Sequence, residues 1–331
     1  MRRTLRTVSL VALSLVMSAP LVGCATNAAT GKLQFNSLSR EQEISLGEEA
    51  MPGLVEGYGG EVRDDRLRSY VSAIGMELAL NAEEEYRDIP WEFVLLDSEV
   101  INAFALPGGK VFVSRGLMER MTNESQLAAV LGHEVAHVTA EHADQQVSRQ
   151  MIISGIAIGA TVAAGTQDSE YWQYAVPAIV GGAGLFNLKF GRDEESEADT
   201  LGMRYMTRAG YNPRGMLELM EILRDASGGG GGQLEILATH PLPDTRIRRV
   251  TRILEEDYAR QVADPNRVVG ELRFQREILP MLRQLSEAGR DKPLTDGEKI
   301  LMASTNRSCW CAGAWVPPPR ASNGSRQTIS A

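Results

Sequence analysis

The spacing of apolar positions predicts that the chain enters its folded part through helices. Ser39 followed by Gln42 forms a capping-box pattern that opens a helix through the acidic stretch 41–51. Residues 65–82 repeat apolar side chains at intervals of three and four, which predicts an amphipathic helix. Two helices are therefore expected before the first strand.

Strand patterns follow, and then a long helix. Residues 91–97 form a short apolar run rich in aromatic and branched side chains, and 101–114 holds two such runs separated by Pro107-Gly108-Gly109. This arrangement predicts one strand and a hairpin in a small antiparallel sheet. A helix is expected to begin near Asn123 and to continue to Gln150.

Further along the chain, two apolar segments rich in Gly and Ala occupy 151–165 and 174–186. Both are shorter than the roughly 20 residues that a membrane span requires, so buried helices are favoured over a flap lying against a membrane. Amphipathic helices are expected at 193–210 and 213–226, followed by a flexible pentaglycine loop. Helix is also expected over 251–305.

Composition indicates a globular protein. The 331 residues are 43% hydrophobic, which is enough for one substantial core with smaller appendages. Lys and Arg total 34 against 43 Asp and Glu, a formal charge of -9, so a broad basic surface for nucleic acid is not expected.

The first 23 residues have the order of a secretory signal peptide, with Arg2, Arg3 and Arg6 preceding an apolar run and small residues. The run ends in Leu-Val-Gly-Cys, which resembles a bacterial lipobox with Cys24 as the lipid-modified residue. Ala25, the residue after Cys24, resembles the residue that directs lipoproteins of this kind to the periplasmic face of the outer membrane. Residues 24–38 would then be a lipidated tether. The alternative is an ordinary cleaved signal in which the cysteine is incidental.

The other cysteines, Cys309 and Cys311, lie in a Pro-, Ser- and Gly-rich tail. Three cysteines in total give no disulfide framework. Residues 306–331 are expected to be disordered, although an intermolecular disulfide through this tail is an alternative.

The segment Val130–Val138 reads VLGHEVAHV and contains the pattern H-E-x-x-H. His133 and His137 are four positions apart, so both imidazoles project from one helix face, and Glu134 can reach a metal-bound water without being a ligand. The alternative is a pair of polar residues on a solvated helix face. Apolar neighbours favour a metal, because buried imidazoles need partners.

A third ligand should lie downstream. His142 is about 140° around the helix from His137, which places it away from the metal or behind a ligand. In the acidic segment 193–199, Glu195 is followed one turn later by Asp199. This pair fits Glu195 on the metal and Asp199 accepting the spare N–H of a ligating histidine, His133 for preference.

Four ordered motifs carry a resemblance to a known family: NAFALPGG, LAAVLGHEVAHV, EESEAD and a later THP followed by Arg. The chain resembles, over roughly 39–250, the HtpX-like, CAAX-prenyl-protease-related gluzincin metallopeptidases, especially their periplasmic lipoprotein branch with its BepA- and LoiP-like members. The resemblance implies an α+β, mainly helical zincin-type domain whose sheet-edge strand borders the cleft. It also implies that one Zn²⁺ binds His133, His137 and Glu195, with Glu134 as general base and Asp199 as orienting residue.

Two further groups of side chains are candidates for contact with a peptide substrate. His240, helped by Arg246, is the leading donor to the oxygen that becomes negative during hydrolysis. The resemblance also allows His240 to occupy the open zinc position and hold the enzyme latent, and an ordinary turn residue is the third possibility. Asn102, Ala103 and Phe104 are expected to line the cleft on an edge strand, or else to be core residues.

These expectations combine into a zinc endopeptidase domain at 39–250, a helical extension at 251–305 and a tether to the outer membrane. Its substrates would be misfolded or stalled envelope proteins, and the outer-membrane assembly machinery is a possible partner. The alternative is a chaperone-like lipoprotein that binds clients with little or no proteolysis. An intact Glu134 favours the enzyme, since binding needs no general base.

Overall fold

A computed structural model describes residues 24–150, 189–227, 234–242 and 244–289. The expected signal peptide, the two Gly/Ala-rich segments, the pentaglycine loop and the tail with Cys309 and Cys311 lie outside these ranges. No helix within the described ranges is long and apolar enough to span a membrane.

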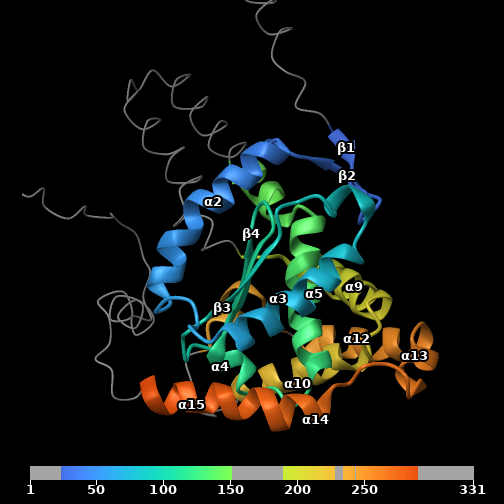
Figure 1. The fold of residues 1–331 in the computed structure, drawn as a ribbon. Coiled ribbons are helices and arrows are strands. Elements are labelled where there is room, and N and C mark those ends of the chain that lie inside the picture. Colours follow the sequence, from blue (N-terminus) through green and yellow to red (C-terminus); the bar gives the residue numbers. More distant parts are fainter. Residues whose placement is uncertain (1–23, 151–188, 228–233, 243, 290–331) are drawn as a thin grey trace, which may run out of the picture.

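Most of the described chain is helical, and its short strands all fall within residues 24–114 (Figure 1). In chain order the elements are β1 (Cys24–Thr26), β2 (Leu33–Phe35), α2 (Arg40–Gly57), α3 (Asp65–Leu80), η1 (Glu84–Tyr86), β3 (Glu92–Leu96), β4 (Ala103–Leu106), β5 (Lys110–Ser114), α4 (Arg115–Met118), α5 (Glu124–Thr139), α9 (Arg192–Arg208), α10 (Arg214–Ser227), α11 (Ile236–Thr239), α12 (Asp244–Glu256), α13 (Ala259–Ala263), α14 (Glu271–Arg273), η3 (Phe274–Ile278) and α15 (Leu279–Gly289).

The expected capping signals are present at the first helices. Ser39 caps α2, and its side chain and that of Gln42 each accept a backbone N–H of the other residue. Asn123 caps α5, with its side-chain oxygen accepting the backbone N–H of Gln126. Each cap satisfies N–H groups that a helix leaves unpaired at its first turn, so the helices begin where the sequence predicted.

The main sheet has the strand order β3-β5-β4. The predicted hairpin is present, because β4 and β5 are antiparallel neighbours joined through Pro107-Gly108-Gly109. β3, however, pairs with β5 in parallel, so the sheet is mixed and not purely antiparallel. β4 has a strand neighbour on one side only within the described residues, which makes it the edge strand next to α5.

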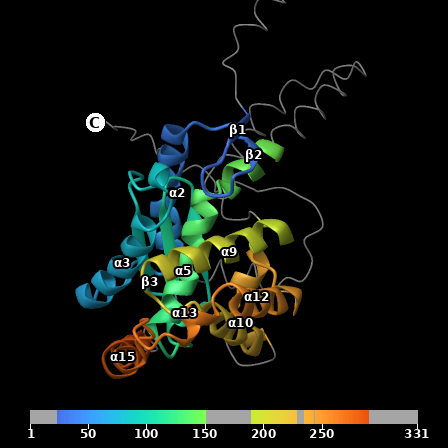
Figure 2. The same ribbon diagram turned by 90° about the vertical axis from the view of Figure 1, so that its right-hand side faces the viewer.

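Helix α5 runs through the centre of the molecule (Figures 1 and 2). It contacts α3, α9, α10 and the strands β4 and β5. Its residues are buried almost all round, including the polar ones, which is unlike a helix with one solvated face. The polar side chains of the H-E-x-x-H segment are therefore inside the protein, where each needs a partner.

The crossing of α5 and α9 depends on two glycines. A Cβ atom added to Gly202 of α9 would lie 3.0 Å from the backbone nitrogen of His133, and one added to Gly132 of α5 would lie 3.2 Å from the carbonyl oxygen of Gly202. The two backbones therefore pack directly against each other. This close approach brings Glu195 and Asp199, both on α9, next to the histidines of α5.

The expected continuous helix from 123 to 150 is interrupted. α5 ends at Thr139, and Glu141 takes a left-handed conformation with φ of 56° before helix resumes at residues 142–150. The side chain of Glu141 accepts hydrogen bonds from Asn36 and from the Tyr86 hydroxyl at 3.1 Å. These bonds hold the break, and the break changes the direction of the following turn, which carries His142.

Residues 24–38, expected to be a tether, fold against the domain instead of forming a plain linker. β1 and β2 pair as an antiparallel hairpin, with Cys24 opposite Phe35. The buried amide of Asn27 donates to the Thr139 carbonyl at 2.9 Å, and that of Gln34 donates to the Ala140 carbonyl at 3.1 Å. The hairpin thus supplies partners to carbonyls that the end of α5 leaves free.

The C-terminal helices belong to the same core. Phe274, Ile278 and Leu282 are at most 5% exposed and join the core cluster that includes α3 and α5. The predicted boundary at residue 250 falls within α12, where Val250 is completely buried. The extension after 250 is mainly helical up to residue 289, with a non-helical stretch at 264–270, and it packs as part of the domain.

Candidate metal centre

The structure brings four predicted side chains together at the crossing of α5 and α9. The Nε2 atoms of His133 and His137 are 3.1 Å apart, and the carboxylate of Glu195 lies 3.5 Å from the first and 3.4 Å from the second. His240, at the end of α11, completes the cluster, and one ligand atom from each residue lies within 4.8 Å of the others. All four side chains are buried.

The far side of the His133 ring faces a network of full charges. Nδ1 of His133 lies 3.1 Å from Asp199, as the i to i+4 spacing from Glu195 had suggested. Asp199 in turn accepts two hydrogen bonds from Arg246, at 3.0 and 2.6 Å, and the same guanidinium also donates to Glu195. One buried arginine thus holds both carboxylates in place.

The far side of the His137 ring faces another histidine. Nδ1 of His137 lies 2.9 Å from Nδ1 of His142, whose Nε2 lies 3.3 Å from Glu197. Glu197 forms an ion pair with Lys32 at 2.7 Å. His142 is completely buried, whereas the Lys32 side chain is 62% exposed, so this row of contacts runs from the metal ligands to the surface at the N-terminal hairpin.

The two environments shift the imidazole pKa values in opposite directions. Burial works against protonation of both rings. At His133 the hydrogen bonds with Asp199 and Glu195 outweigh burial and raise the pKa to about 10. At His137 burial prevails and lowers the pKa well below its ordinary value.

Glu134 points into the same space without a partner. It is 1% exposed, and neither of its oxygens has a hydrogen-bond donor among the described residues. Burial raises the pKa of this carboxyl, against the opposing charges of His240 and His133. A carboxylate with a raised pKa is a stronger base, which suits proton abstraction from a water molecule.

His240 lies across the cluster from α5. Its Nδ1 is 2.8 Å from Glu195, while its Nε2 has no hydrogen-bond partner in the described chain and lies 3.8 Å from Glu134. This position is close enough for the ring to act either on a bound substrate or as a fourth metal ligand. Both roles suggested by the sequence therefore remain compatible with the geometry.

Arg246, expected to help His240, is directed elsewhere. The side chain is 7% exposed, and its guanidinium donates to Asp199, Glu195 and the carbonyl of Pro241. These bonds occupy the guanidinium with the two carboxylates and one backbone carbonyl. Its contacts favour a positioning role over direct donation to a substrate.

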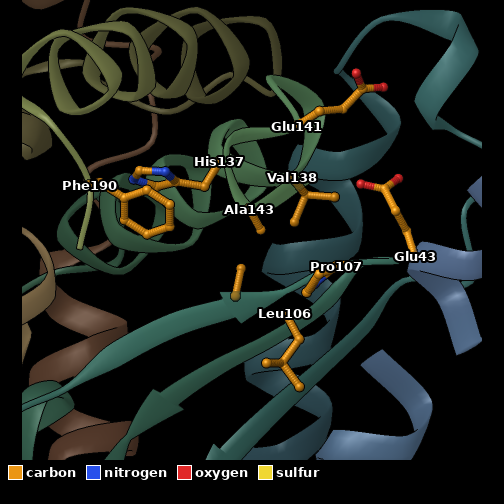
Figure 3. A pocket seen from close by; sticks show the side chains of 9 residues that line it. Glu43, Leu106, Pro107, His137, Val138, Glu141, Ala143 and Phe190 are labelled. Carbon is orange, nitrogen blue, oxygen red and sulfur yellow. The ribbon is translucent and has the colours of Figure 1, made fainter. Parts of the chain in front are cut away.

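The edge strand borders the site, but through other residues than those predicted. Asn102 and Ala103 are buried, and Phe104 stacks on Phe112 with ring centroids 4.7 Å apart. Asn102 donates to the Tyr58 hydroxyl at 2.8 Å, so its side chain is in the core. A pocket beside His137 is drawn in Figure 3, and its lining consists of Glu43, Ala105, Leu106, Pro107, His137, Val138, Glu141, Ala143 and Phe190.

Phe190 is a site residue that sequence reasoning did not assign, and His142 is one for which it left two positions open, away from the metal or behind a ligand. The Phe190 ring lies 4.1 Å from the His137 ring between centroids, and Figure 3 shows the two side by side. Phe190 is an isolated aromatic in a polar stretch, which gives no signal by itself. The structure places His142 behind the ligand His137, after the helix break at Glu141.

The donor set fits a small divalent metal of the zinc type. Zinc is bound by imidazole nitrogens and carboxylate oxygens at about 2.0–2.1 Å, and tetrahedral ligands at that radius are roughly 3.3 Å from one another. The Nε2 atoms of His133 and His137 are 3.1 Å apart, and they lie 3.5 and 3.4 Å from the two different carboxylate oxygens of Glu195.

Comparison with known proteins agrees with this geometry. The chain is 33% identical to the beta-barrel assembly-enhancing protease of Escherichia coli over 217 residues, which is 64% of this chain and 44% of that protein. It is 30% identical to the mitochondrial metalloendopeptidase OMA1 of Schizosaccharomyces pombe over 235 residues, or 69% of this chain and 65% of the relative. The chain thus spans less than two thirds of either relative. Residues 65–254 match the profile of peptidase family M48, and the chain belongs to that family.

Proposed function

We propose that the protein is a zinc-dependent endopeptidase. The observation that carries the proposal is the buried group of His133, His137 and Glu195 at tetrahedral spacing, next to a Glu134 carboxylate without a hydrogen-bond partner in the described chain. A structural metal site requires no unpaired carboxylate beside its ligands, whereas hydrolysis requires a general base at this position.

In this proposal a zinc ion held by His133, His137 and Glu195 would polarise the substrate carbonyl and acidify a water molecule. Glu134 takes the proton from that water and passes it to the nitrogen that leaves when the peptide bond breaks. His240 donates from Nε2 to the oxygen on which negative charge develops. Asp199 and Arg246 keep His133 and Glu195 in position.

The edge strand β4 supplies a place for the substrate backbone. It has a strand neighbour on one side only within the described residues, and its end, with Leu106 and Pro107, faces the pocket beside His137 (Figure 3). A peptide added to this edge would be held through backbone hydrogen bonds, with little demand on its sequence. Unfolded chains, whose backbones are accessible, are the class of substrate that such a site would accept.

The cellular role we propose is quality control of envelope proteins at the periplasmic face of the outer membrane. It is supported by the signal-peptide and lipobox patterns that end at Cys24 and by the printed name of the Escherichia coli relative, which refers to beta-barrel assembly. Acyl chains on Cys24 would anchor the protein. Misfolded or misassembled envelope proteins would be substrates, and the assembly machinery a partner.

Replacement of Glu134 tests the catalytic part of the proposal. Glu134→Gln should keep zinc at one ion per chain, measured by elemental analysis, and reduce casein cleavage by about 100-fold or more. Glu48→Gln, at an exposed position on α2, is the matched control and should cleave normally. Cleavage that survives in Glu134→Gln would overturn the mechanism and favour the client-binding alternative.

A further inference from the structure

The row of contacts behind His137 determines the tautomers of two histidines. If Nε2 of His137 binds the metal, its proton must be on Nδ1, and the atom facing that proton is Nδ1 of His142 at 2.9 Å. Nδ1 of His142 must then accept, which requires the proton of His142 to be on Nε2. That nitrogen faces the carboxylate of Glu197 at 3.3 Å, and a carboxylate can only accept.

We propose that His142 is a positioning residue for the metal ligand His137, and that Glu197 and Lys32 fix its tautomer. The residues His137, His142, Glu197 and Lys32 together are called the His142 relay below. The inference rests on the proposed zinc centre. It assigns to His142 the task that Asp199 performs for His133, namely to accept the ligand's Nδ1–H and leave Nε2 free for the metal.

The packing around His142 supports this task. The side chain has no exposed surface, and the Phe190 ring, which also contacts His137, lies 6.1 Å from it between centroids. The left-handed Glu141 redirects the chain just before His142. In the continuous helix expected from the sequence, a residue five positions after His137 would point away from it. The break therefore brings this imidazole to its place.

The relay also links the metal centre to the N-terminal hairpin. Lys32 lies between β1 and β2, and the hairpin is fixed to the end of α5 through Asn27 and Gln34. Lys32 forms an ion pair with Glu197 at 2.7 Å, and the same carboxylate lies 3.3 Å from Nε2 of His142. The geometry of one ligand thus depends on a segment about 100 residues earlier in the chain.

Two substitutions at position 142 separate the hydrogen bond from the volume of the side chain. His142→Leu fills the space but cannot accept, and it should weaken zinc binding by about 10-fold or more. His142→Asn places an amide oxygen near the position of Nδ1, and it should remain within about threefold of the unsubstituted chain. Zinc dissociation constants are measured on the full chain by competition with a chromophoric chelator, and circular dichroism of the zinc-free proteins checks that each variant folds.

The result that overturns the proposal is a His142→Leu protein that folds and binds zinc as tightly as the unsubstituted chain, or a His142→Asn protein that binds no better than His142→Leu. Nitrogen-15 spectra of the histidines in the zinc-loaded chain give an independent answer. They should show the proton of His142 on Nε2 and that of His137 on Nδ1, and the opposite assignment for His142 contradicts the relay.

These measurements do not depend on proteolysis. A chain that binds zinc through the relay but cleaves no protein would refute the proposed function and leave the relay supported. A chain that takes up no zinc would refute both.

Discussion

The two ligating imidazoles of α5 are held by different physical means. His133 rests against the buried carboxylate of Asp199, which Arg246 holds with two hydrogen bonds. His137 rests against His142, whose further partners lead out to an exposed lysine. Behind His133 lies a buried network of full charges, whereas His137 contacts an imidazole, and the charged pair of Glu197 and Lys32 lies one step further out. The Nδ1 atom of the metal ligand thus faces a carboxylate at His133 and an imidazole nitrogen at His137.

The difference should appear most strongly in stability. Arg246→Met leaves the carboxylates of Asp199 and Glu195 buried without their cation, and we expect it to lower the free energy of unfolding by about 3–5 kcal/mol. Arg249→Met is the matched control, because Arg249 is on the same helix and bonds the carbonyl of Ser196 and the hydroxyl of Thr200, which are neutral.

The control should lose only about 1 kcal/mol, as is typical of hydrogen bonds to neutral partners. Urea unfolding of the zinc-free proteins measures both values. Equal losses in the two variants would mean that the charged groups around His133 stabilise the fold no more than hydrogen bonds to neutral partners do. The proposed difference between the His133 and His137 sides would then be wrong.

A smaller and pH-dependent effect is expected in the pocket on the His137 side. Burial, followed by the charges of Glu141 and Asp144, raises the pKa of Glu43 from 4.5 to about 8. The folded chain therefore binds more protons at Glu43 than the unfolded chain between these pH values. Stability contributed by this group is present below pH 4.5 and is lost as the pH rises through 8.

Glu43→Gln should remove this loss. At pH 8 we expect the variant to be more stable than the unsubstituted chain by on the order of 1 kcal/mol, since partial exposure screens the interaction. At pH 4.5 the two should be alike. Urea unfolding across this pH range is the measurement, with Glu48→Gln on the same helix as control, and a difference that grows toward acid pH would reverse the sign argued here.

The smallest effect is expected at the outer end of the His142 relay. Lys32→Met should cost less than about 1 kcal/mol of unfolding free energy, because the lysine is 62% exposed and its ion pair is screened by solvent. Arg68→Met, which removes an exposed ion pair with Asp65 on α3, should behave alike. A loss at Lys32 as large as that at Arg246 would show that the relay, too, depends on charge.

The sequence predicted more of the His133 side of the site than of the His137 side. The His133 side follows from helical spacing alone, since His133 with His137 and Glu195 with Asp199 are both pairs one turn apart. Local periodicity was sufficient because each pair belongs to one continuous helix. The structure then shows which helices cross, and it places the two pairs together.

The His137 side could not be predicted in the same way, because it depends on a conformation that the sequence does not mark. Left-handed turns at the end of helices usually carry Gly or Asn, and here the residue is Glu141. Its conformation is held by Asn36 and Tyr86, which are distant in sequence. The docking of residues 24–38 was missed for a related reason, because their small polar composition is also that of a linker.

The edge strand β4 shows another reason why the sequence did not predict the whole site. Its existence and hairpin turn followed from the pattern, but the pattern does not reveal where along the strand the pocket lies. Phe104 packs on Phe112 in the core, while Ala105 and Leu106 reach the pocket. Only tertiary packing decides which part of such a strand adjoins a ligand site.

The direct contact between Gly132 and Gly202 has a consequence for ion selectivity. Because main chain touches main chain at the crossing, the distance between the two backbones that carry the donor residues of α5 and α9 is fixed by direct contact. Calcium, which takes six to eight oxygen ligands at about 2.3–2.6 Å, would need the helices to separate and would find too few oxygens. The close crossing of α5 and α9 therefore favours a small cation that prefers nitrogen ligands.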